Sequence, residues 1–209
     1  MVHSAAVGGT TKREVVTAFR TGEILAAAHA VFAARGFDGA TIADIAEAAG
    51  VAKGTVYLDY RSKREVYWAT LERDLIDLGE RLAAALTVAD GVAAKVRAFI
   101  ATKLAHFDAN RDFFRIYFGA FGHPAGRAAA SAPGLDRHIR QQVGALESIL
   151  RQAAERGEIR AIDPAATAFA IFDLTRGVIT QRLRGWSQRE LEDDVSQLFN
   201  LVWRGIAAS

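Results

Sequence analysis

Apolar residues recur every three or four positions along most of this chain, which is the spacing of one face of an α-helix. The clearest stripes lie at 24, 25, 28, 31 and 32; at 67, 71, 75, 78 and 82; at 139, 143, 146 and 150; and at 191, 195, 198, 202 and 206. No window shows the sustained alternation of apolar and polar residues that a strand requires. The pattern therefore predicts an all-α protein of about nine helices.

Capping pairs and glycines predict where the first helices begin and end. Ser or Thr followed three residues later by an acidic residue is typical of a helix start, and it occurs at 11, 41, 62 and 187. Gly36 and Gly50 are typical helix stops. We therefore expect a first helix from about 12 to 36, two short helices at about 41–50 and 52–59, and a long helix after 62.

The later helices are separated by one irregular segment. Apolar stripes predict helices at about 92–107 and 135–156, with a short aromatic helix around 111–121. Residues 119–134 are rich in Gly, Ala and Pro, which is typical of a loop. Asp163 before Pro164 is an N-cap followed by proline at the first helical position, and it marks another helix start.

Composition excludes several classes of protein. The chain has 209 residues, of which 51% are hydrophobic and 24% charged, so it can form a packed core. It has no cysteine, which excludes disulfides and thiol catalysis. Its N-terminus lacks a signal-peptide core, and we find no apolar run near the roughly 18 residues of a membrane span. We therefore expect a cytoplasmic protein.

Two short helices joined at Gly50 behind a longer first helix form a helix-turn-helix pattern. In this arrangement the second short helix lies in the major groove of DNA, while the first crosses the backbone. Positive charge also concentrates here, although the net charge of the chain is only +2. The residues that we expect to contact phosphates or base edges are Thr41, Lys53, Gly54, Thr55, Tyr57, Tyr60 and Lys63.

Three segments with fixed spacing strengthen this interpretation. They are ILAAAHAVFAARGF at 24–37, TIADIA at 41–46 and GVAKGTVY at 50–57, followed by Ser62 and Lys63. Together they closely resemble the tetracycline-repressor (TetR) family of bacterial regulators. The resemblance implies a homodimer with an N-terminal DNA-binding domain and a C-terminal ligand-binding domain. It also implies repression that a small molecule relieves.

Two positions depart from the family pattern. Ala52 stands where such sequences usually carry a capping Ser, so the recognition helix loses a cap worth about 1 kcal/mol. Asp59 stands where an aromatic residue or His is common, and it would repel phosphate if it faced DNA. We therefore expect Asp59 to turn towards Arg61 or solvent.

Aromatic residues concentrate in the middle third of the chain, where they form either an ordinary core or a pocket for an apolar or aromatic ligand. Basic residues nearby could supply the few polar groups that such a pocket needs. The candidate ligand-binding residues are Phe99, Lys103, His106, Phe107, Phe114, Tyr117, Phe118, Phe121 and Arg176.

The segment 164–172 is apolar around almost its whole circumference, so its helix must be covered on more than one side. In a lone chain it would be a central core helix. The family resemblance instead implies that it and the final helix form a four-helix dimer interface, with Phe169, Phe172, Leu198 and Val202 as candidates.

No pattern typical of a metal site, a nucleotide loop or a catalytic centre is present, so we expect no metal, no cofactor and no enzymatic activity. The predicted organisation is a mobile tail at 1–11, a helix-turn-helix domain at 12–66, and a ligand-binding and dimerisation domain at 67–209. The predicted function is a regulator, most often a repressor in this family, that a ligand releases from a near-palindromic operator. Two alternatives are a ligand-independent architectural DNA-binding protein and a helical-bundle enzyme or lipid carrier.

Overall fold

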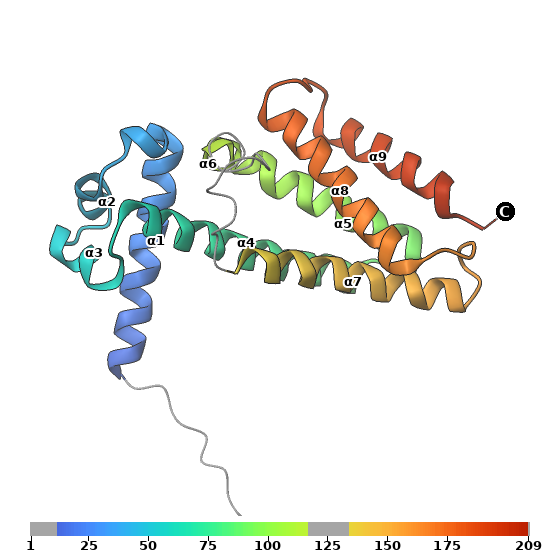
Figure 1. The fold of residues 1–209 in the computed structure, drawn as a ribbon, viewed down its shortest axis with the longest axis horizontal. Helices are drawn as coiled ribbons and strands as arrows, with labels where there is room; N and C mark the ends of the chain where they lie inside the picture. The colour runs from blue at the N-terminus through green and yellow to red at the C-terminus, as the bar shows by residue number, and fades with distance from the viewer. Residues whose placement is uncertain (1–11, 117–133, 209) are drawn as a thin grey trace, which may run out of the picture. The chain divides into compact units, whose positions relative to one another are not determined.

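The computed structural model describes residues 12–116 and 134–208, and these residues form nine helices (Figure 1). The helices are α1 (Lys12–Gly39), α2 (Ile42–Ala48), α3 (Lys53–Asp59), α4 (Lys63–Val88), α5 (Gly91–Ala109), α6 (Arg111–Ile116), α7 (Leu135–Glu155), α8 (Pro164–Leu183) and α9 (Leu191–Ile206). The only β-type pairing in the described residues is an isolated antiparallel bridge between Ile159 and Ala207. The predicted all-α class is confirmed.

The chain divides into an N-terminal unit, Met1–Thr70, and a C-terminal unit, Leu71–Ser209. Helix α4 begins in the first unit and continues into the second. The boundary that the sequence predicts, between residues 66 and 67, lies four residues earlier on the same helix. The tail predicted at 1–11 lies outside the described residues, as does most of the loop predicted at 119–134.

The N-terminal unit is built on contacts of α2 with α1 and with α3. Ile24, Phe32 and Ile45 are fully buried, and the rings of Phe32 and Tyr67 meet edge to face at 5.2 Å. Gly36 has a φ of 69° and interrupts the helical geometry of α1, as its sequence position predicts. These buried side chains therefore form a core that supports α2 and α3 from one side.

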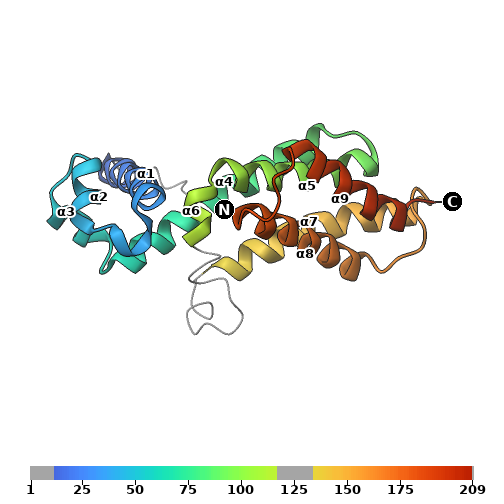
Figure 2. The same cartoon turned by 90° about the horizontal axis from the view of Figure 1, so that it is seen from above.

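Helix α5 is central to the C-terminal unit, because α7, α8 and α9 all pack against it. Figure 2 shows α9 and α8 running beside α5, with α7 along α8. Phe99, Ile100 and Leu104 of α5 are buried in this packing. In the described residues, the backbone of α4 does not approach any other helix as closely as these four helices approach one another.

Two sequence-based details differ from the structure. The capping box predicted at Ser187 is wrong, because α9 begins at Leu191 with Glu190 as an N-cap whose side chain makes no capping hydrogen bond. The hydroxyl of Ser187 bonds instead to the carboxylate of Asp194. The aromatic helix predicted around 111–121 is present as α6 up to Ile116, and residues 117–121 lie outside the described residues.

The second difference concerns α1. In the described part of the chain one helix, Val15–Gly39, is long and apolar enough to cross a membrane by length and composition alone, although the sequence analysis expected none. Only 22% of its apolar window is buried. Ile24, Ala28 and Phe32 form the buried face, whereas Val16 and Phe19 near its start are exposed.

Candidate DNA-binding surface and ligand pocket

Helix α2 is fixed at its start by the capping box that the sequence predicts. The Thr41 hydroxyl accepts a hydrogen bond from the Asp44 amide at 3.1 Å, and the Asp44 carboxylate accepts one from the Thr41 amide at 2.9 Å. The same carboxylate also accepts a hydrogen bond from the Thr41 hydroxyl at 2.8 Å, and this bond, followed by the one from the Thr41 amide, lowers the pKa of Asp44. Arg35 of α1 also contacts this carboxylate at 2.6 Å. Thr41 thus positions α2 through its hydroxyl, whether or not it also reaches DNA.

The turn between α2 and α3 needs glycine at position 50, where φ is 65°. The next helix, α3, has Ala52 as its N-cap, and the Ala52 side chain makes no capping bond, as its residue type predicts. Val56 of α3 is fully buried and holds the helix against the unit. The turn and this contact leave the opposite face of α3 directed outwards.

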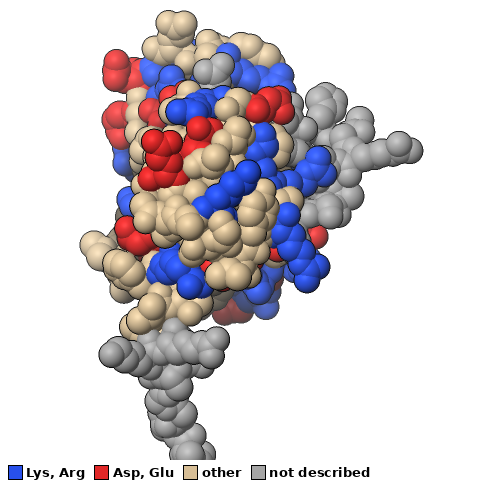
Figure 3. Space-filling view, turned by 90° about the vertical axis from the view of Figure 1, so that its left-hand side faces the viewer, with Lys and Arg blue, Asp and Glu red and all other residues tan. Residues whose placement is uncertain are grey.

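That outward face carries most of the predicted DNA-contacting residues. Lys53 and Gly54 are exposed, Thr55 is half-buried and Tyr57 is 47% exposed. The ammonium of Lys53 lies 5.9 Å from the centre of the Tyr57 ring. In the space-filling view, Lys and Arg side chains cross the face that carries α2 and α3 (Figure 3). The surface combines positive charge, a hydroxyl and an aromatic ring on one short helix.

Tyr60 and Lys63 are placed differently from the residues on α3. Tyr60 is buried and closes the C-terminal end of the helix. The Lys63 ammonium donates to the carbonyl oxygens of Ala40 at 2.9 Å and Asp38 at 3.3 Å. It also lies 4.7 Å from the centre of the Phe37 ring. Lys63 therefore ties the start of α4 to the end of α1.

Asp59 neither turns to Arg61 nor stays in solvent, so that expectation is wrong. Its carboxylate forms an ion pair with Arg20 of α1 at 3.2 Å, with both side chains half-buried. The pair joins positions 39 residues apart, which local sequence could not reveal. It neutralises the acidic group that would otherwise repel phosphate.

The C-terminal unit contains a pocket that we call the main pocket. About 560 Å³ of space between its walls is not filled by protein atoms, and this figure includes open solvent at its mouth. Its walls come from α4, α5, α6, α7 and α8. They are Leu71, Leu75, Leu78, Lys103, Phe107, Phe114, His138, Ile139, Gln142, Phe172, Arg176 and Ile179.

A second cavity, the side pocket, adjoins the main pocket and shares Leu75, His138 and Gln142 with it. It measures about 440 Å³, also with an open side, and lies among α4, α5 and α7. The two cavities together follow the inner face of α4. Apolar side chains line most of both, and the shared His138 and Gln142 bring polar atoms to the junction.

Four of the nine predicted ligand-binding residues line the main pocket: Lys103, Phe107, Phe114 and Arg176. Phe99 lines the side pocket. His106 is buried but lines neither cavity, and its Nδ1 lies 3.8 Å from the carboxylate of Asp77. Tyr117, Phe118 and Phe121 lie outside the described residues.

Sequence analysis missed the contribution of α7. His138 and Gln142 are buried polar residues on a strongly amphipathic helix, at the edge of its apolar stripe. A polar residue in line with positions 139, 143 and 146 was the available signal. Phe172 was predicted at a dimer interface, whereas the structure places it in the main pocket.

The other predicted interface residues divide by exposure. Phe169 on α8 is 52% exposed, whereas Leu198 and Val202 on α9 are buried within the chain. The outer sides of these helices instead present Leu174, which is 44% exposed, and Leu201, which is 64% exposed. Phe169 is thus the one predicted interface residue that the described chain leaves largely uncovered.

The comparisons with known proteins agree with this architecture. Residues 24–70 match the family described as bacterial regulatory proteins, tetR family, and residues 89–199 match the tetracyclin repressor-like C-terminal domain. These matches cover the helix-turn-helix and most of the unit that contains the pockets. The chain belongs to the TetR family. It is a DNA-binding transcriptional regulator of a family whose members bind effector ligands and dimerise.

A curated relative is the HTH-type transcriptional activator FasR of Mycolicibacterium smegmatis, which is 31% identical over 99 residues. That match spans 47% of this chain and 45% of the relative, so it covers less than half of either protein.

Solved structures extend the similarity in fold to nearly the whole chain. FadR from Bacillus subtilis, in complex with stearoyl-CoA, has a TM-score of 0.73 at 19% identity, over 87% of this chain and 96% of that one. FadR from Bacillus halodurans also scores 0.73, at 21% identity, over 88% and 94% of the two chains.

Proposed function

We propose that this TetR-family protein acts in the cytoplasm as a homodimeric repressor. It binds a near-palindromic operator and leaves it when an apolar ligand occupies the main pocket. The DNA-binding part rests on the surface of α3. Val56 is the one buried residue of this helix, and the opposite face exposes Lys53, Gly54 and Tyr57.

Gly54 supports direct contact between α3 and DNA. A Cβ built on this residue would meet no atom of the described protein within 4 Å, and its φ is not positive. Neither packing nor backbone conformation in the chain therefore requires glycine at this position. Close approach of a sugar-phosphate wall would require it, with Lys53 and Thr55 reaching a phosphate or a base edge beside it.

The remaining predicted contacts act around this helix. Thr41 and Lys63 reach phosphates on either side of the groove, and Tyr57 and Tyr60 place hydroxyls near the backbone. Because the ammonium of Lys63 is already bonded to two carbonyl oxygens, its phosphate contact is shared with a structural role. The two α3 helices of a dimer would read half-sites about 34–36 Å apart, or a multiple of that spacing.

The ligand has an apolar body, and a fatty acyl chain fits the pockets well. The walls are mainly Leu, Ile and Phe, and the two adjoining cavities extend along α4. The stearoyl-CoA complex of the structurally similar FadR supports this choice. Since α4 also carries Lys63 and the last residues of the N-terminal unit, a ligand that displaces α4 can change how the recognition helices are held.

One observation favours a second candidate function, which is activation of transcription. The curated relative is an activator, so the same DNA-binding and ligand-binding parts could increase transcription. A ligand-independent architectural protein is less well supported, because it has no need of a pocket with a buried lysine.

The test begins with selection of bound duplexes from a random pool, followed by measurement of affinity at several salt concentrations. We expect a near-palindromic site and binding that weakens with salt. Replacing Lys53 or Thr55 should alter base preference by about 1–3 kcal/mol if these residues read base edges. Equal losses on selected and scrambled duplexes would show that α3 positions the protein without reading sequence. Transcription in vitro from a promoter carrying the selected site separates repression from activation.

A further inference from the structure

Lys103 is a buried cation in the wall of the main pocket. Only 3% of the residue is exposed, and its ammonium lies 3.7 Å from the centre of the Phe172 ring. It donates to Gln142 Oε1 at 2.7 Å, its only hydrogen-bond acceptor among the described residues. A lysine ammonium carries three N–H donors. Two of them therefore have no acceptor within the described protein.

This arrangement is costly for the empty protein. A charged group loses its hydration on burial, and one hydrogen bond and two aromatic faces replace that hydration only in part. Burial, followed by the nearby Arg176 charge, lowers the pKa of Lys103 to about 7. The protein thus keeps a lysine where leucine or methionine would cost less, which indicates a partner for the ammonium.

Two further polar groups lie in the same wall. Among the described residues the amide nitrogen of Gln142 donates no hydrogen bond, and its oxygen already accepts from Lys103. The buried Nε2 of His138 makes no hydrogen bond in the described chain, and its nearest acidic atom, Glu72 Oε1, is 3.7 Å away. Both residues line the main pocket and the side pocket. The unused donors therefore gather where the two apolar cavities join.

We propose that Lys103 is the headgroup site of this pocket and binds the carboxylate of a hydrophobic acid, whose apolar body lies against the leucine and phenylalanine side chains around it. The inference rests on the ligand-binding role proposed above and specifies the chemical class of the ligand. The carboxylate accepts the two unused N–H groups of Lys103, and the Gln142 amide or His138 supplies a further donor.

A competing position for the carboxylate is Arg176, which lines the same pocket. Its side chain is 60% exposed and already forms an ion pair with Asp173 at 3.0 Å. An anion held there would remain hydrated and would gain little selectivity. The buried lysine discriminates more strongly, because a neutral ligand leaves its donors without acceptors.

Binding of the acid has a defined pH dependence. A carboxylate beside Lys103 raises the pKa of the lysine above its value of about 7 in the empty pocket. Affinity for the acid therefore falls as pH rises above about 7, until the pKa of the complex is passed, and the complex takes up a proton on forming.

Other groups near the pocket could add to this dependence. Helix α8 contributes Arg176 and Asp173, and α7 contributes His138, whereas the described side chains of α4, α6 and α9 place no charge in either lining. Outside the linings, Asp74 of α4 has its pKa raised to about 7, mainly by burial. The contribution of Lys103 is the part of the pH dependence that disappears when Lys103 alone is replaced.

The experiment measures binding of dodecanoate, methyl dodecanoate and dodecanoyl-CoA to the full chain by calorimetry at pH 6.5 and 8, in two buffers with different ionisation enthalpies. For the wild type we expect the acid to bind about tenfold or more tightly than the ester at the lower pH. At the higher pH we expect uptake of a proton with the acid and none with the ester.

Two variants assign the effect. Lys103→Met keeps the volume and should abolish both the preference for the acid and the proton uptake, while the ester still binds. Arg176→Met removes the competing cation and should keep the preference for the acid, while proton uptake moves to higher pH because the Arg176 charge no longer lowers the pKa of Lys103. Circular dichroism checks that each variant is folded.

Several outcomes would overturn the proposal. They are equal affinity for acid and ester in the wild type, a preference that survives Lys103→Met or is lost with Arg176→Met, tightest binding of the thioester, or binding of no probe. Binding of the unliganded protein to the selected operator, measured in parallel, tests the proposed function separately. Retention of operator binding with any of these outcomes would reject the acid and leave the regulator intact.

Discussion

The absence of a side chain at position 54 is as informative as the side chains around it. A glycine near the start of a helix is unfavourable, because the unfolded chain loses more conformational freedom there than at any other residue. Gly54 occupies the second position of α3, where no neighbour in the described protein limits the space. The protein therefore gives up some helix stability at the position that would meet DNA.

Gly54→Ala should raise the free energy of unfolding by about 0.5–1 kcal/mol, because alanine favours the helix. The same change should weaken operator binding at least several-fold, since the added methyl group meets the sugar-phosphate wall. Thermal unfolding and fluorescence anisotropy measure the two effects. Gly144→Ala in α7, also in open space, is the control that should gain stability without loss of affinity. Equal operator affinity in both variants would show that α3 does not approach DNA closely.

A second prediction at this scale concerns Lys63. Its two hydrogen bonds to the carbonyl oxygens of Asp38 and Ala40 close the end of α1. Lys63→Met should therefore lower the free energy of unfolding by about 1–2 kcal/mol as well as weaken DNA binding. Lys53→Met, which removes an exposed cation, should change stability by no more than about 0.5 kcal/mol. Denaturant unfolding of the two variants decides whether Lys63 has a structural role; identical stabilities would contradict it.

These residues show how far the sequence can lead at this scale. The capping pair of Thr41 and Asp44 lies within one helical turn, so its geometry follows from spacing alone. The partners of Asp59 and Lys63 lie 39 and 23 residues away, and only the fold of the unit brings them together, Asp59 at the end of α3 and Lys63 at the start of α4. The sequence pattern predicted that α3 would expose its polar side chains, but it could not predict these distant polar contacts.

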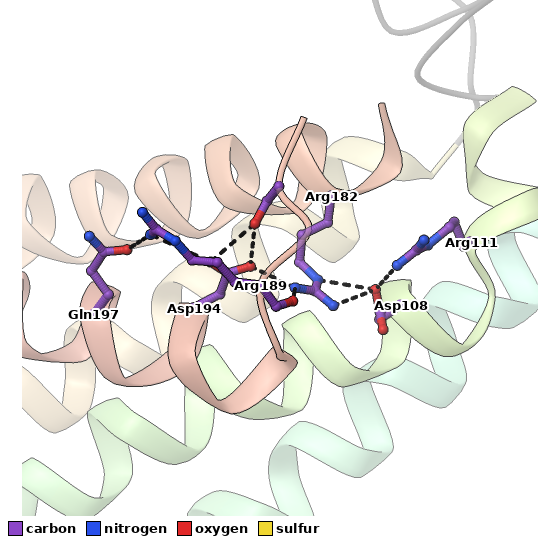
Figure 4. Close-up of polar contacts among 7 residues, drawn as sticks. Asp108, Arg111, Arg182, Arg189, Asp194 and Gln197 are labelled. Carbon is purple, nitrogen blue, oxygen red and sulfur yellow. Dashed lines mark hydrogen bonds and ion pairs between the residues drawn. The ribbon is translucent and has the colours of Figure 1, made fainter. Parts of the chain in front are cut away.

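At the scale of helices, a buried ionic network holds four elements of the C-terminal unit together (Figure 4). Arg182 at the end of α8 bonds Asp194 in the first turn of α9 at 2.6 Å and Asp108 near the end of α5 at 3.0 Å. Arg111 of α6 reaches the same Asp108 oxygen at 2.7 Å. The network fixes the loop before α9, because Ser187 and the carbonyl of Arg189 also take part.

Arg182→Met should destabilise the C-terminal unit by about 3–5 kcal/mol, because it leaves the buried Asp194 carboxylate without its main partner. Arg111→Met, at a more exposed position, should cost no more than about 1 kcal/mol. Denaturant unfolding at neutral pH compares the two variants. A loss below about 1 kcal/mol for Arg182→Met would mean that the network adds little to stability.

The network also predicts a response to acid. Burial tends to raise the pKa of Asp108, but hydrogen bonds from Arg111 and Arg182 outweigh burial and lower it. A carboxyl group with a lowered pKa stabilises the fold above its unfolded value of about 4, and this contribution is lost as pH falls through the folded value. The difference in stability between the wild type and Arg182→Met should therefore shrink below about pH 4.

Sequence patterns located the helices better than the contacts between them. The stripes of α4, α7 and α9 reflect burial of one face, which recurs at every turn and is visible without a structure. The start of α9 was misassigned because Ser187 and Glu190 have capping spacing, whereas Asp194 takes the Ser187 hydroxyl in the folded chain. The pocket residues of α7 were also missed. Five helices pack together to form the main pocket, and a stripe along one helix does not show which of its side chains border that cavity.

At the scale of the whole molecule, the outer sides of α8 and α9 determine how two copies could associate. Leu198 and Val202 already pack within the chain, so they can affect an interface only indirectly. Phe169 and Leu201 are exposed apolar side chains on these two helices, and the half-buried Phe199 and Trp203 rings of α9 stack 5.9 Å apart. An exposed apolar surface on the last two helices fits the homodimer proposed above.

Phe169→Glu should convert the protein to a monomer, because a two-fold interface would place the new charges from both subunits in an apolar contact. Operator affinity should fall with it, since a monomer reads only one half-site. Analytical ultracentrifugation at micromolar concentration measures the first effect and anisotropy the second. Leu58→Glu on α3 is the control for surface charge, expected to remain dimeric while binding DNA poorly. A dimeric Phe169→Glu protein would place the interface elsewhere.

The last prediction links the pocket to DNA. If ligand and operator favour different arrangements of the dimer, each must weaken the binding of the other by the same factor, because coupling free energy is reciprocal. Coupling of about 1–3 kcal/mol would lower operator affinity about 5- to 150-fold at saturating ligand. Ligand affinity, measured by calorimetry with and without saturating operator, should change by that same factor. Leu78→Trp should fill the main pocket and produce DNA binding that no ligand alters, because Leu78 is fully buried in the pocket wall on α4. If ligands bind the wild type tightly yet leave operator affinity unchanged at saturation, the pocket does not control DNA binding.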